Sequence, residues 1–211
     1  MNKKLYWDDQ GAVSSIRKVL SEGNVVAGTS DTIPGLLAPI SLQGVMFLDE
    51  IKKRRDKPYL VLIESKKKLL RFIDKEKIHH IESLLEYCWP GPLTVILPPK
   101  KEVPSYALSK EGTIALRVPN HEGLLTLLKD FDGLFSTSAN IADQPVPKTA
   151  DEIDPSILEK VAYLVVDSIE VGTSKPSTIL DCTGKQIKVV REGEYSVGEL
   201  EKIYGQQFIK K

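Results

Sequence analysis

The chain contains 211 residues, of which 41% are hydrophobic and 27% are charged, proportions typical of a globular protein with one sizeable core. Its formal net charge of zero argues against a protein that coats nucleic acid or a membrane surface. The two cysteines, Cys88 and Cys182, are too few and too isolated for a disulfide framework or a zinc site. The N-terminal residues form no apolar stretch and no run reaches transmembrane length, so we expect a cytoplasmic protein without membrane contact.

Short apolar runs bounded by polar or turn residues predict eight β-strands. The first of them follows an amphipathic helix that ends near Ser21. Because these strands outnumber the strand–helix pairs of a doubly wound fold, we expect a single α+β domain over 1–211 with a twisted mixed sheet flanked by helices. The predicted strands are 24–29, 59–63, 93–98, 113–118, 134–138, 163–167, 177–181 and 187–191.

Amphipathic patterns and capping signals predict the remaining helices. Two starts fit the capping box, in which a serine or threonine is followed three residues later by a glutamate. These are Thr149 with Glu152, and Ser196 with Glu199. The predicted helices are 41–52, 66–87, 121–130, 149–160 and 196–204.

Three cationic segments lie at the edges of predicted strands: Lys52 to Lys57, Arg117 and Arg191. None is accompanied by a serine or cysteine nucleophile with a histidine, or by a cluster of metal ligands, so we assign no metal-ligating residue. Fixed cations beside small hydroxyl and amide side chains suit the binding of polyphosphate and carboxylate. We therefore expect a site where the substrates react with one another while the protein supplies position and charge.

Lys52 and Arg54 can act together only if the helix over 41–52 ends near Lys52. Residues two apart point in nearly opposite directions on a helix, but to one side on an extended segment. Pro58 favours such an end because it biases Lys57 away from helical backbone. The alternative is a solvated helix end whose cations match the helix dipole.

Two polar segments follow predicted strands. Thr29 to Leu36 carries hydroxyls and a glycine that could hold a small polar ligand, or could form an ordinary turn. Ser138 and Asn140 could both reach one ligand from an extended segment, although polar residues at strand ends often only form loops. Arg117 interrupts an apolar run, so we expect it to have either a carboxylate partner or an anionic ligand.

In their order along the chain, these motifs resemble the YrdC-like family of threonylcarbamoyl-AMP synthases in its short, single-domain form, over about residues 10–195. The resemblance implies a YrdC-like fold with a large basic concave cleft. The spacing from Lys52 to Lys57 is one residue shorter than in the family, so Lys53 or Arg55 could take the place of a neighbour. The matching motifs are Thr29-Ser30-Asp31-Thr32-Ile33-Pro34-Gly35-Leu36, Lys52-Lys53-Arg54, Trp89-Pro90-Gly91-Pro92-Leu93-Thr94, Arg117-Val118-Pro119, Ser138-Ala139-Asn140, Ser177-Thr178-Ile179-Leu180-Asp181 and Arg191-Glu192-Gly193.

The resemblance implies that the amine of L-threonine captures bicarbonate and that the new carboxylate displaces pyrophosphate from ATP, giving threonylcarbamoyl-AMP for tRNA modification. It also implies Mg²⁺ bound with ATP, and a tRNA threonylcarbamoyl-transfer complex as the partner that receives the product. Lys52 and Arg54 would be catalytic cations exposed to the cleft, so alanine at either position would lower kcat/KM about 100-fold without unfolding the chain. ATP would contact Lys52, Arg54, Lys57, Ser138, Asn140 and Arg191, and threonine would contact Ser30, Thr32, Arg117, Ser138 and Ser177.

The residues alone are also compatible with two other functions. A module with the same basic cleft could bind RNA weakly through its phosphates, without catalysis and with steep salt dependence. A carbamoyl-transfer domain that acts on another acceptor would use the same kind of site. Zero net charge and the scarcity of aromatic residues near the cations favour the synthase over the RNA-binding module.

Overall fold

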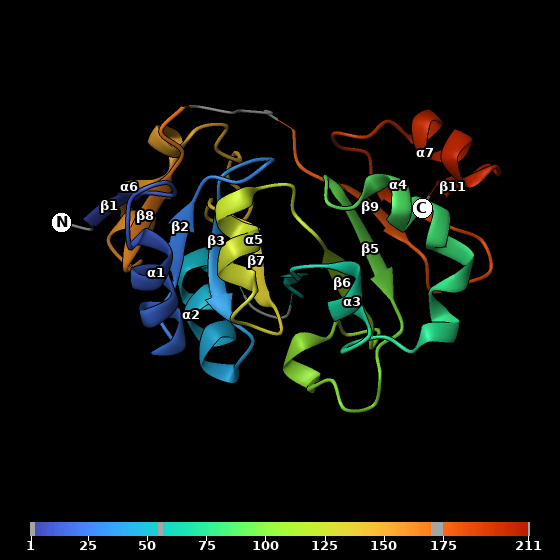
Figure 1. The fold of residues 1–211 in the computed structure, drawn as a ribbon, viewed down its shortest axis with the longest axis horizontal. Coiled ribbons are helices and arrows are strands. Elements are labelled where there is room, and N and C mark those ends of the chain that lie inside the picture. The colour runs from blue at the N-terminus through green and yellow to red at the C-terminus, as the bar shows by residue number, and fades with distance from the viewer. Residues whose placement is uncertain (1–2, 55–56, 170–174, 211) are drawn as a thin grey trace.

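In the computed structural model, which describes residues 3–54, 57–169 and 175–210, eleven strands form one sheet (Figure 1). Their order across the sheet is β1-β8-β2-β3-β7-β4-β6-β5-β9-β10-β11. Five neighbouring pairs are parallel and five are antiparallel, which confirms the expected mixed sheet. The strands are β1 Lys3–Tyr6, β2 Val26–Gly28, β3 Gly35–Pro39, β4 Leu60–Leu62, β5 Leu93–Leu97, β6 Ile114–Arg117, β7 Leu134–Ser138, β8 Tyr163–Val166, β9 Thr178–Asp181, β10 Lys188–Arg191 and β11 Ile209–Lys210.

All eight predicted strands are present, with bounds equal to or shorter than expected. Three strands, β1, β3 and β11, were not predicted. Pro34, Gly35 and Pro39 give β3 the composition of a turn, yet its backbone pairs with β2 on one side and β7 on the other. β1 lies at the edge of the sheet and pairs with β8, so it could form without an apolar run.

The helix predicted over 66–87 is wrong as one continuous element. It is divided into α3, two short 3₁₀ turns and α4. Asp74 takes an extended backbone with ψ 142°, and the carbonyl of Phe72 accepts a hydrogen bond from Lys100 N at 2.7 Å instead of continuing a helix. The helices are α1 Ala12–Ser21, α2 Leu42–Lys52, α3 Lys66–Leu69, α4 Glu82–Cys88, α5 Glu122–Leu128, α6 Pro155–Leu158 and α7 Val197–Tyr204.

The helix predicted to start at Thr149 is also interrupted, and its capping box is absent. A 3₁₀ turn comes first, and α6 begins only at Pro155. Asp154 has an extended backbone with ψ 130°, as the residue before a proline usually does. The carboxylate of Glu152 accepts from Lys148 N at 2.8 Å rather than capping from within a helix.

Two helix ends agree with the sequence. α7 begins with the predicted capping box, since Ser196 Oγ accepts from Glu199 N at 3.3 Å and the Glu199 carboxylate accepts from Ser196 N at 2.9 Å. α2 ends at Lys52, and Lys53 takes a left-handed backbone with φ 51°. The chain therefore leaves the helix before Arg54, which was the condition for Lys52 and Arg54 to reach one region.

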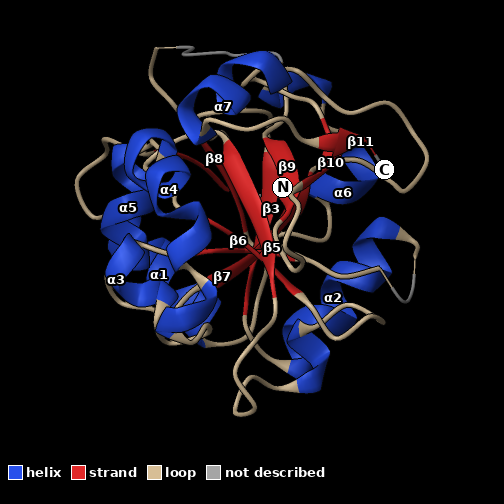
Figure 2. Ribbon diagram, turned by 90° about the vertical axis from the view of Figure 1, so that its right-hand side faces the viewer, coloured by secondary structure: helices blue, strands red, loops and turns tan. Residues whose placement is uncertain are grey.

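Helices cover both faces of the sheet, and each face has its own core. On one face, α2 and α6 contribute Leu48, Ile51 and Ile157 to the main hydrophobic cluster. On the other face, α1 and α5 contribute Ile16 and Leu127, among others, to a second cluster. Figure 2 shows these two pairs of helices on opposite sides of the strands.

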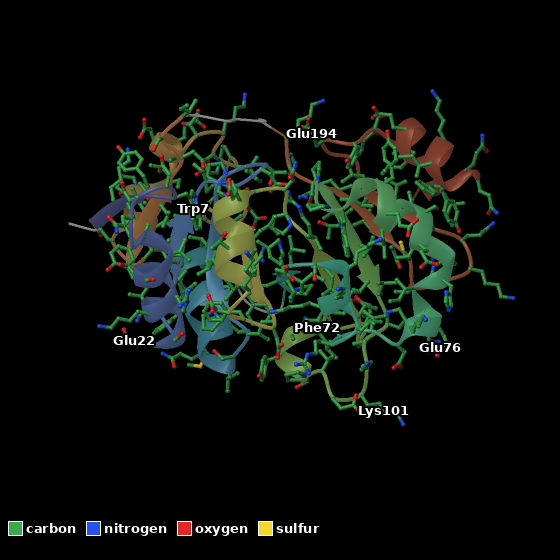
Figure 3. The ribbon with its side chains drawn as sticks, viewed as in Figure 1. Trp7, Glu22, Phe72, Glu76, Lys101 and Glu194 are labelled. Atoms are coloured by element: carbon green, nitrogen blue, oxygen red, sulfur yellow. The ribbon has the colours of Figure 1, made fainter. Side chains whose placement is uncertain are left out.

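Polar and apolar side chains are divided between surface and interior in the ordinary way. Glu22, Glu76 and Lys101 point outwards, whereas Trp7 and Phe72 are buried (Figure 3). Among the helices of the described residues, none combines the length and the apolar character that crossing a membrane would require.

Candidate active site

A cavity of about 370 Å³ lies on the face of the sheet that α1 and α5 partly cover. In four central strands its lining residues alternate, because successive side chains of a strand point to opposite faces. Their neighbours Leu36, Val61, Val95 and Leu116 belong to the main core on the other face. The alternating lining residues are Gly35 and Leu37 in β3, Leu60 and Leu62 in β4, Thr94 and Ile96 in β5, and Ala115 and Arg117 in β6.

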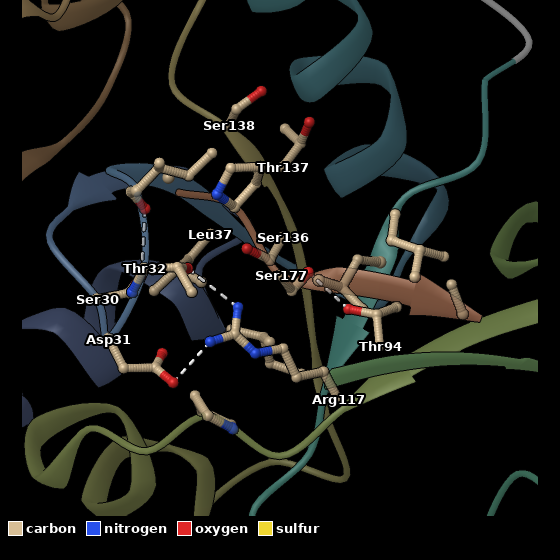
Figure 4. Close-up of a pocket in the computed structure, with 18 of the residues that line it drawn as sticks. Ser30, Asp31, Thr32, Leu37, Thr94, Arg117, Ser136, Thr137, Ser138 and Ser177 are labelled. Atoms are coloured by element: carbon tan, nitrogen blue, oxygen red, sulfur yellow. Dashed lines mark hydrogen bonds and ion pairs between the residues drawn. The ribbon is translucent and has the colours of Figure 1, made fainter. Parts of the chain in front are cut away.

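Arg117 projects from β6 towards the loop between β2 and β3 (Figure 4). Its guanidinium forms an ion pair with Asp31 Oδ2 at 2.6 Å and donates to Thr32 Oγ1 at 3.0 Å. Its Nε donates to the carbonyl of Gly91 at 3.0 Å. Ser30 Oγ lies 3.2 Å from Thr32 Oγ1, so the loop that was expected to bind threonine is fastened to Arg117 through two neighbouring side chains.

Asp31 explains why an arginine stands in an apolar strand. Arg117 is 4% exposed; burial lowers its pKa, and the charge and hydrogen bond of Asp31 raise it. Asp31 Oδ2 also accepts from Asn120 N at 2.8 Å, which ties the loop after β6 to the same carboxylate. Of the two explanations left open by the sequence, the carboxylate partner is confirmed. A ligand carboxylate in the cavity would therefore share Arg117 with Asp31.

Lys52 is not exposed to the cavity, so that expectation was wrong: the residue is 1% exposed. Its Nζ donates to the carbonyl of Ser138 at 2.7 Å and to Asn140 Oδ1 at 2.8 Å, and lies 3.4 Å from Ser138 Oγ. Ala142 N donates to the carbonyl of Lys52 at 2.9 Å, so the turn after β7 runs along the end of α2 and covers the side chain. Three acceptors match the three hydrogens of an ammonium group. Burial lowers the pKa of Lys52 to about 8, and the charges of two neighbouring basic side chains act in the same direction.

The turn after β7 is held by a chain of side-chain hydrogen bonds. Ser138 Oγ donates to Asn140 Oδ1 at 2.6 Å, and Asn140 Nδ2 donates to the carbonyl of Gln144 at 2.7 Å. Of Lys52, Ser138 and Asn140, only Ser138 lines the cavity. Lys52 and Asn140 thus hold the turn that presents Ser138.

Arg54 does line the cavity, as predicted. Its guanidinium carbon lies 4.9 Å from the centroid of the Tyr59 ring, and its Nε is buried without a hydrogen-bond partner among the described residues. Lys57 is exposed and is not one of the lining residues. Of the two alternatives, Lys53 is exposed just beyond the end of α2, and Arg55 lies outside the described residues.

Ser177 and Arg191 meet on another wall of the cavity. Arg191 donates through its terminal nitrogen to the carbonyl of Ser177 at 2.8 Å, and the same nitrogen lies 3.3 Å from Ser177 Oγ. Ser177 Oγ is hydrogen-bonded to Thr94 Oγ1 at 2.8 Å (Figure 4). Gly193 permits this approach, because a Cβ atom there would lie 2.2 Å from the carbonyl oxygen of Pro176.

Seven of the ten predicted site residues line this one cavity, and three do not. Asp31, Thr94 and Tyr59 are among the residues in contact with the lining set that reasoning from the sequence missed. Asp31 was readable as the acidic residue inside the polar loop, and Thr94 as the last residue of a recognised motif, whereas nothing in the sequence marked Tyr59. The seven lining residues are Ser30, Thr32, Arg54, Arg117, Ser138, Ser177 and Arg191, and the other three are Lys52, Lys57 and Asn140.

This arrangement can bind and orient anions, and its described residues offer no nucleophile paired with a base for covalent catalysis. Of the part of the chain that the structure describes, Arg54, Arg117 and Arg191 and several hydroxyl side chains line the cavity together with apolar residues. Within the ranges that the structure describes, no three His, Cys, Asp or Glu side chains are grouped so that they could hold a metal ion. The cavity therefore suits substrates that bring their own reactive groups.

Comparison with known proteins identifies the family of this chain. The Sua5/YciO/YrdC family model, described as telomere recombination, matches residues 18–193. A threonylcarbamoyl-AMP synthase of Pyrococcus abyssi is 31% identical over 190 residues, which are 89% of this chain and 55% of that protein. A threonylcarbamoyl-AMP synthase of Klebsiella pneumoniae is 31% identical over 174 residues, which are 81% of this chain and 90% of that protein.

Solved structures agree in fold. P. abyssi Sua5 complexed with L-threonine has a TM-score of 0.86 and 28% identity, over 99% of this chain and 62% of that chain. E. coli YciO, with a TM-score of 0.78 and 23% identity over 93% of this chain and 98% of that chain, has the same fold. This chain thus spans a little over half of the P. abyssi synthase, but nearly the whole length of the shorter relatives.

Proposed function

Because this chain belongs to the Sua5/YciO/YrdC family, we propose that it is a threonylcarbamoyl-AMP synthase, which makes threonylcarbamoyl-AMP and pyrophosphate from L-threonine, bicarbonate and ATP. The observation that carries the proposal is the convergence of Arg54, Arg117, Ser138 and Arg191 on one cavity. Such a cavity can hold the carboxylate of an amino acid and a polyphosphate together. The enzyme would be a nucleotidyltransferase, since an adenylyl group moves from pyrophosphate to a carboxylate.

The substrates would carry the chemistry. The threonine amine attacks the carbon of bicarbonate, and loss of water leaves a carbamate on the nitrogen. A carbamate oxygen then attacks the α-phosphorus of ATP, and the bond to the β-phosphate oxygen breaks to release pyrophosphate. The protein would contribute by holding the carbamate in line with that bond and by offsetting charge on the departing phosphates.

Both substrates would occupy this one cavity. Ser30, Thr32 and Ser177 would bind threonine, with its carboxylate near Arg117. Arg54, Arg191 and Ser138 would contact ATP. Mg²⁺ would arrive as part of the nucleotide, where it neutralises phosphate charge.

The basic residues that do not line the cavity would act less directly. Lys52 and Asn140 would contribute by fixing the turn of Ser138, while exposed Lys57 would act on ATP only through its charge. The product is a mixed anhydride that water destroys readily, so it would pass to a complex that transfers the threonylcarbamoyl group to tRNA.

Pyrophosphate release from ATP and bicarbonate, measured with and without L-threonine, tests the proposal. We expect release that depends on threonine, and Arg54→Ala should lower kcat/KM about 100-fold. Lys53→Ala, at the exposed neighbouring position, is the matched control and should leave the rate unchanged. Release that does not require threonine would indicate another acceptor, and no release from a folded sample would favour an RNA-binding module.

A further inference from the structure

Arg54 lies between two cavities. Its side chain could pair with an anionic ligand in one cavity or with an acidic side chain in the other. It lines the candidate active site, and it also lines a separate cavity of about 580 Å³ whose wall includes Asp49 and Glu50 of α2. No described carboxylate forms an ion pair with Arg54. An arginine this close to acidic residues would ordinarily pair with one of them, so another contact must account for the position of its side chain.

Tyr59 contacts both members of that potential ion pair. The guanidinium of Arg54 lies over its ring, with 4.9 Å between the guanidinium carbon and the ring centroid. Its hydroxyl donates to Asp49 Oδ1 at 2.6 Å. The ring is 4% exposed and packs against Phe135 with 6.0 Å between centroids, so it is fixed from behind by the core.

We propose that Tyr59 is a positioning residue for Arg54. Its ring supports the guanidinium at the active-site cavity, while its hydroxyl engages the Asp49 carboxylate that would otherwise draw Arg54 into the neighbouring cavity. This inference rests on the proposed function, because the anion that Arg54 would bind is the polyphosphate of ATP. The buried Nε of Arg54, which has no hydrogen-bond partner among the described residues, is the group that this anion would satisfy.

The hydroxyl of Tyr59 remains a donor across the usual pH range. Burial, together with the hydrogen bond to Asp49, raises its pKa above the ordinary value of 10, although a hydrogen bond with Arg54 and the charge of Arg54 act in the opposite direction. The Tyr59–Asp49 contact is therefore a neutral donor on a carboxylate acceptor, and it leaves the positive charge of Arg54 available to a ligand.

Binding of inorganic tripolyphosphate, measured by calorimetry on the full chain, tests the inference without relying on turnover. Removing the ring with Tyr59→Leu should raise the Kd about 3- to 30-fold, the range expected for loss of a cation–π contact. In an Arg54→Ala background the same change should alter the Kd by less than about twofold, because the ring then has no guanidinium to hold. Equal weakening in both backgrounds, or no weakening in either, would overturn the proposal.

Two further variants separate positioning from packing. Phe135→Leu removes a buried aromatic ring that touches Tyr59 in the same core, and should change the tripolyphosphate Kd by less than about twofold. Tyr59→Phe keeps the ring but frees Asp49, so it should weaken binding, and Asp49→Asn added to it should restore the affinity. Failure of that rescue would disprove the role of the hydroxyl even if Tyr59→Leu does not fold.

The outcomes for the two proposals are distinct. A protein that shows the predicted coupling between Tyr59 and Arg54 but releases no pyrophosphate in the presence of threonine would contradict the proposed reaction and leave the positioning role intact. A protein that releases pyrophosphate with threonine but shows no such coupling would support the proposed reaction and contradict the positioning role. Wild-type protein that does not bind tripolyphosphate at all would refute the positioning role.

Discussion

Lys52 Nζ lies 2.8 Å from Asn140 Oδ1, although 88 positions separate the two residues in the chain. The contact joins the end of α2 to the turn after β7 inside the protein, where Lys52 is 1% exposed. Among the described residues, all the acceptors of this ammonium are neutral oxygens of Ser138 and Asn140. The structure therefore shows Lys52 as a buried donor that holds the turn carrying Ser138.

Substitution of Lys52 should destabilise the fold, which revises the expectation that alanine there would be tolerated. Lys52→Met keeps most of the volume but removes the ammonium that donates to the Ser138 carbonyl and to Asn140 Oδ1, which retains the hydrogen bond from Ser138 Oγ. We expect the free energy of unfolding to fall by about 1–3 kcal/mol in urea titration. Lys53→Met, one residue later and exposed, should stay within about 0.5 kcal/mol. Equal urea midpoints for the two variants would refute this account.

The stability of the protein should also carry a pH signature of Lys52. Its pKa is about 8 in the folded protein against an ordinary value of 10.5, so the unfolded chain binds more protons between these values. The contribution of Lys52 to the free energy of unfolding therefore rises as pH increases from about 8 to 10.5, and is lowest below pH 8. Subtracting the pH profile of Lys52→Met from that of the wild type isolates this term. A difference that stays flat over this range would contradict the lowered pKa.

Breaking the pair of Arg117 and Asp31 should leave a buried charge without its partner. Asp31→Ala is expected to lower the free energy of unfolding by about 3–5 kcal/mol, because Arg117 is 4% exposed. Arg117→Met added to Asp31→Ala should recover part of the loss, since it removes the isolated charge. Thermal denaturation of the single and double variants measures this. A double variant less stable than the sum of the two single changes would argue against the pair as the cause.

Gly193 should be intolerant of any side chain, in contrast to a nearby glycine. A Cβ at position 193 would meet the Pro176 carbonyl oxygen at 2.2 Å, so Gly193→Ala must displace the loop that brings Arg191 to Ser177. We expect a loss of about 1–3 kcal/mol in stability. At Gly198, inside α7, an added Cβ would have no atom within 4 Å, and Gly198→Ala should stabilise by about 0.5–1 kcal/mol. If the two changes have the same sign in urea titration, the close approach is not the cause.

Sequence patterns were sufficient for those features that depend on neighbours in the chain. Apolar runs located eight strands, and Ser196 with Glu199 located the start of α7. Local composition was misleading at β3, where proline and glycine suggested a turn and pairing with two other strands decided the outcome. At Asp74 and Asp154, the backbone turned away from the helix that the surrounding pattern favoured.

The candidate site was predictable in its members but not in their contacts. Motif order pointed to seven residues that line one cavity, whereas the sequence pattern around Lys52 is that of a solvated cation at a helix end. Its burial depends on acceptors 86 and 88 positions away, which no local pattern reveals. The partner of Arg117 was likewise 86 positions away, although the need for such a partner was evident from the apolar run itself.

Along β3, β4, β5 and β6, successive residues alternate between the cavity and the main core. A single inserted or deleted residue in one of these strands would exchange the two sets from that point onwards. Leu116 would then face the cavity in place of Arg117, and a guanidinium would enter the main core. Changes in chain length between homologous proteins should therefore be confined to the loops, while the strands change only by substitution.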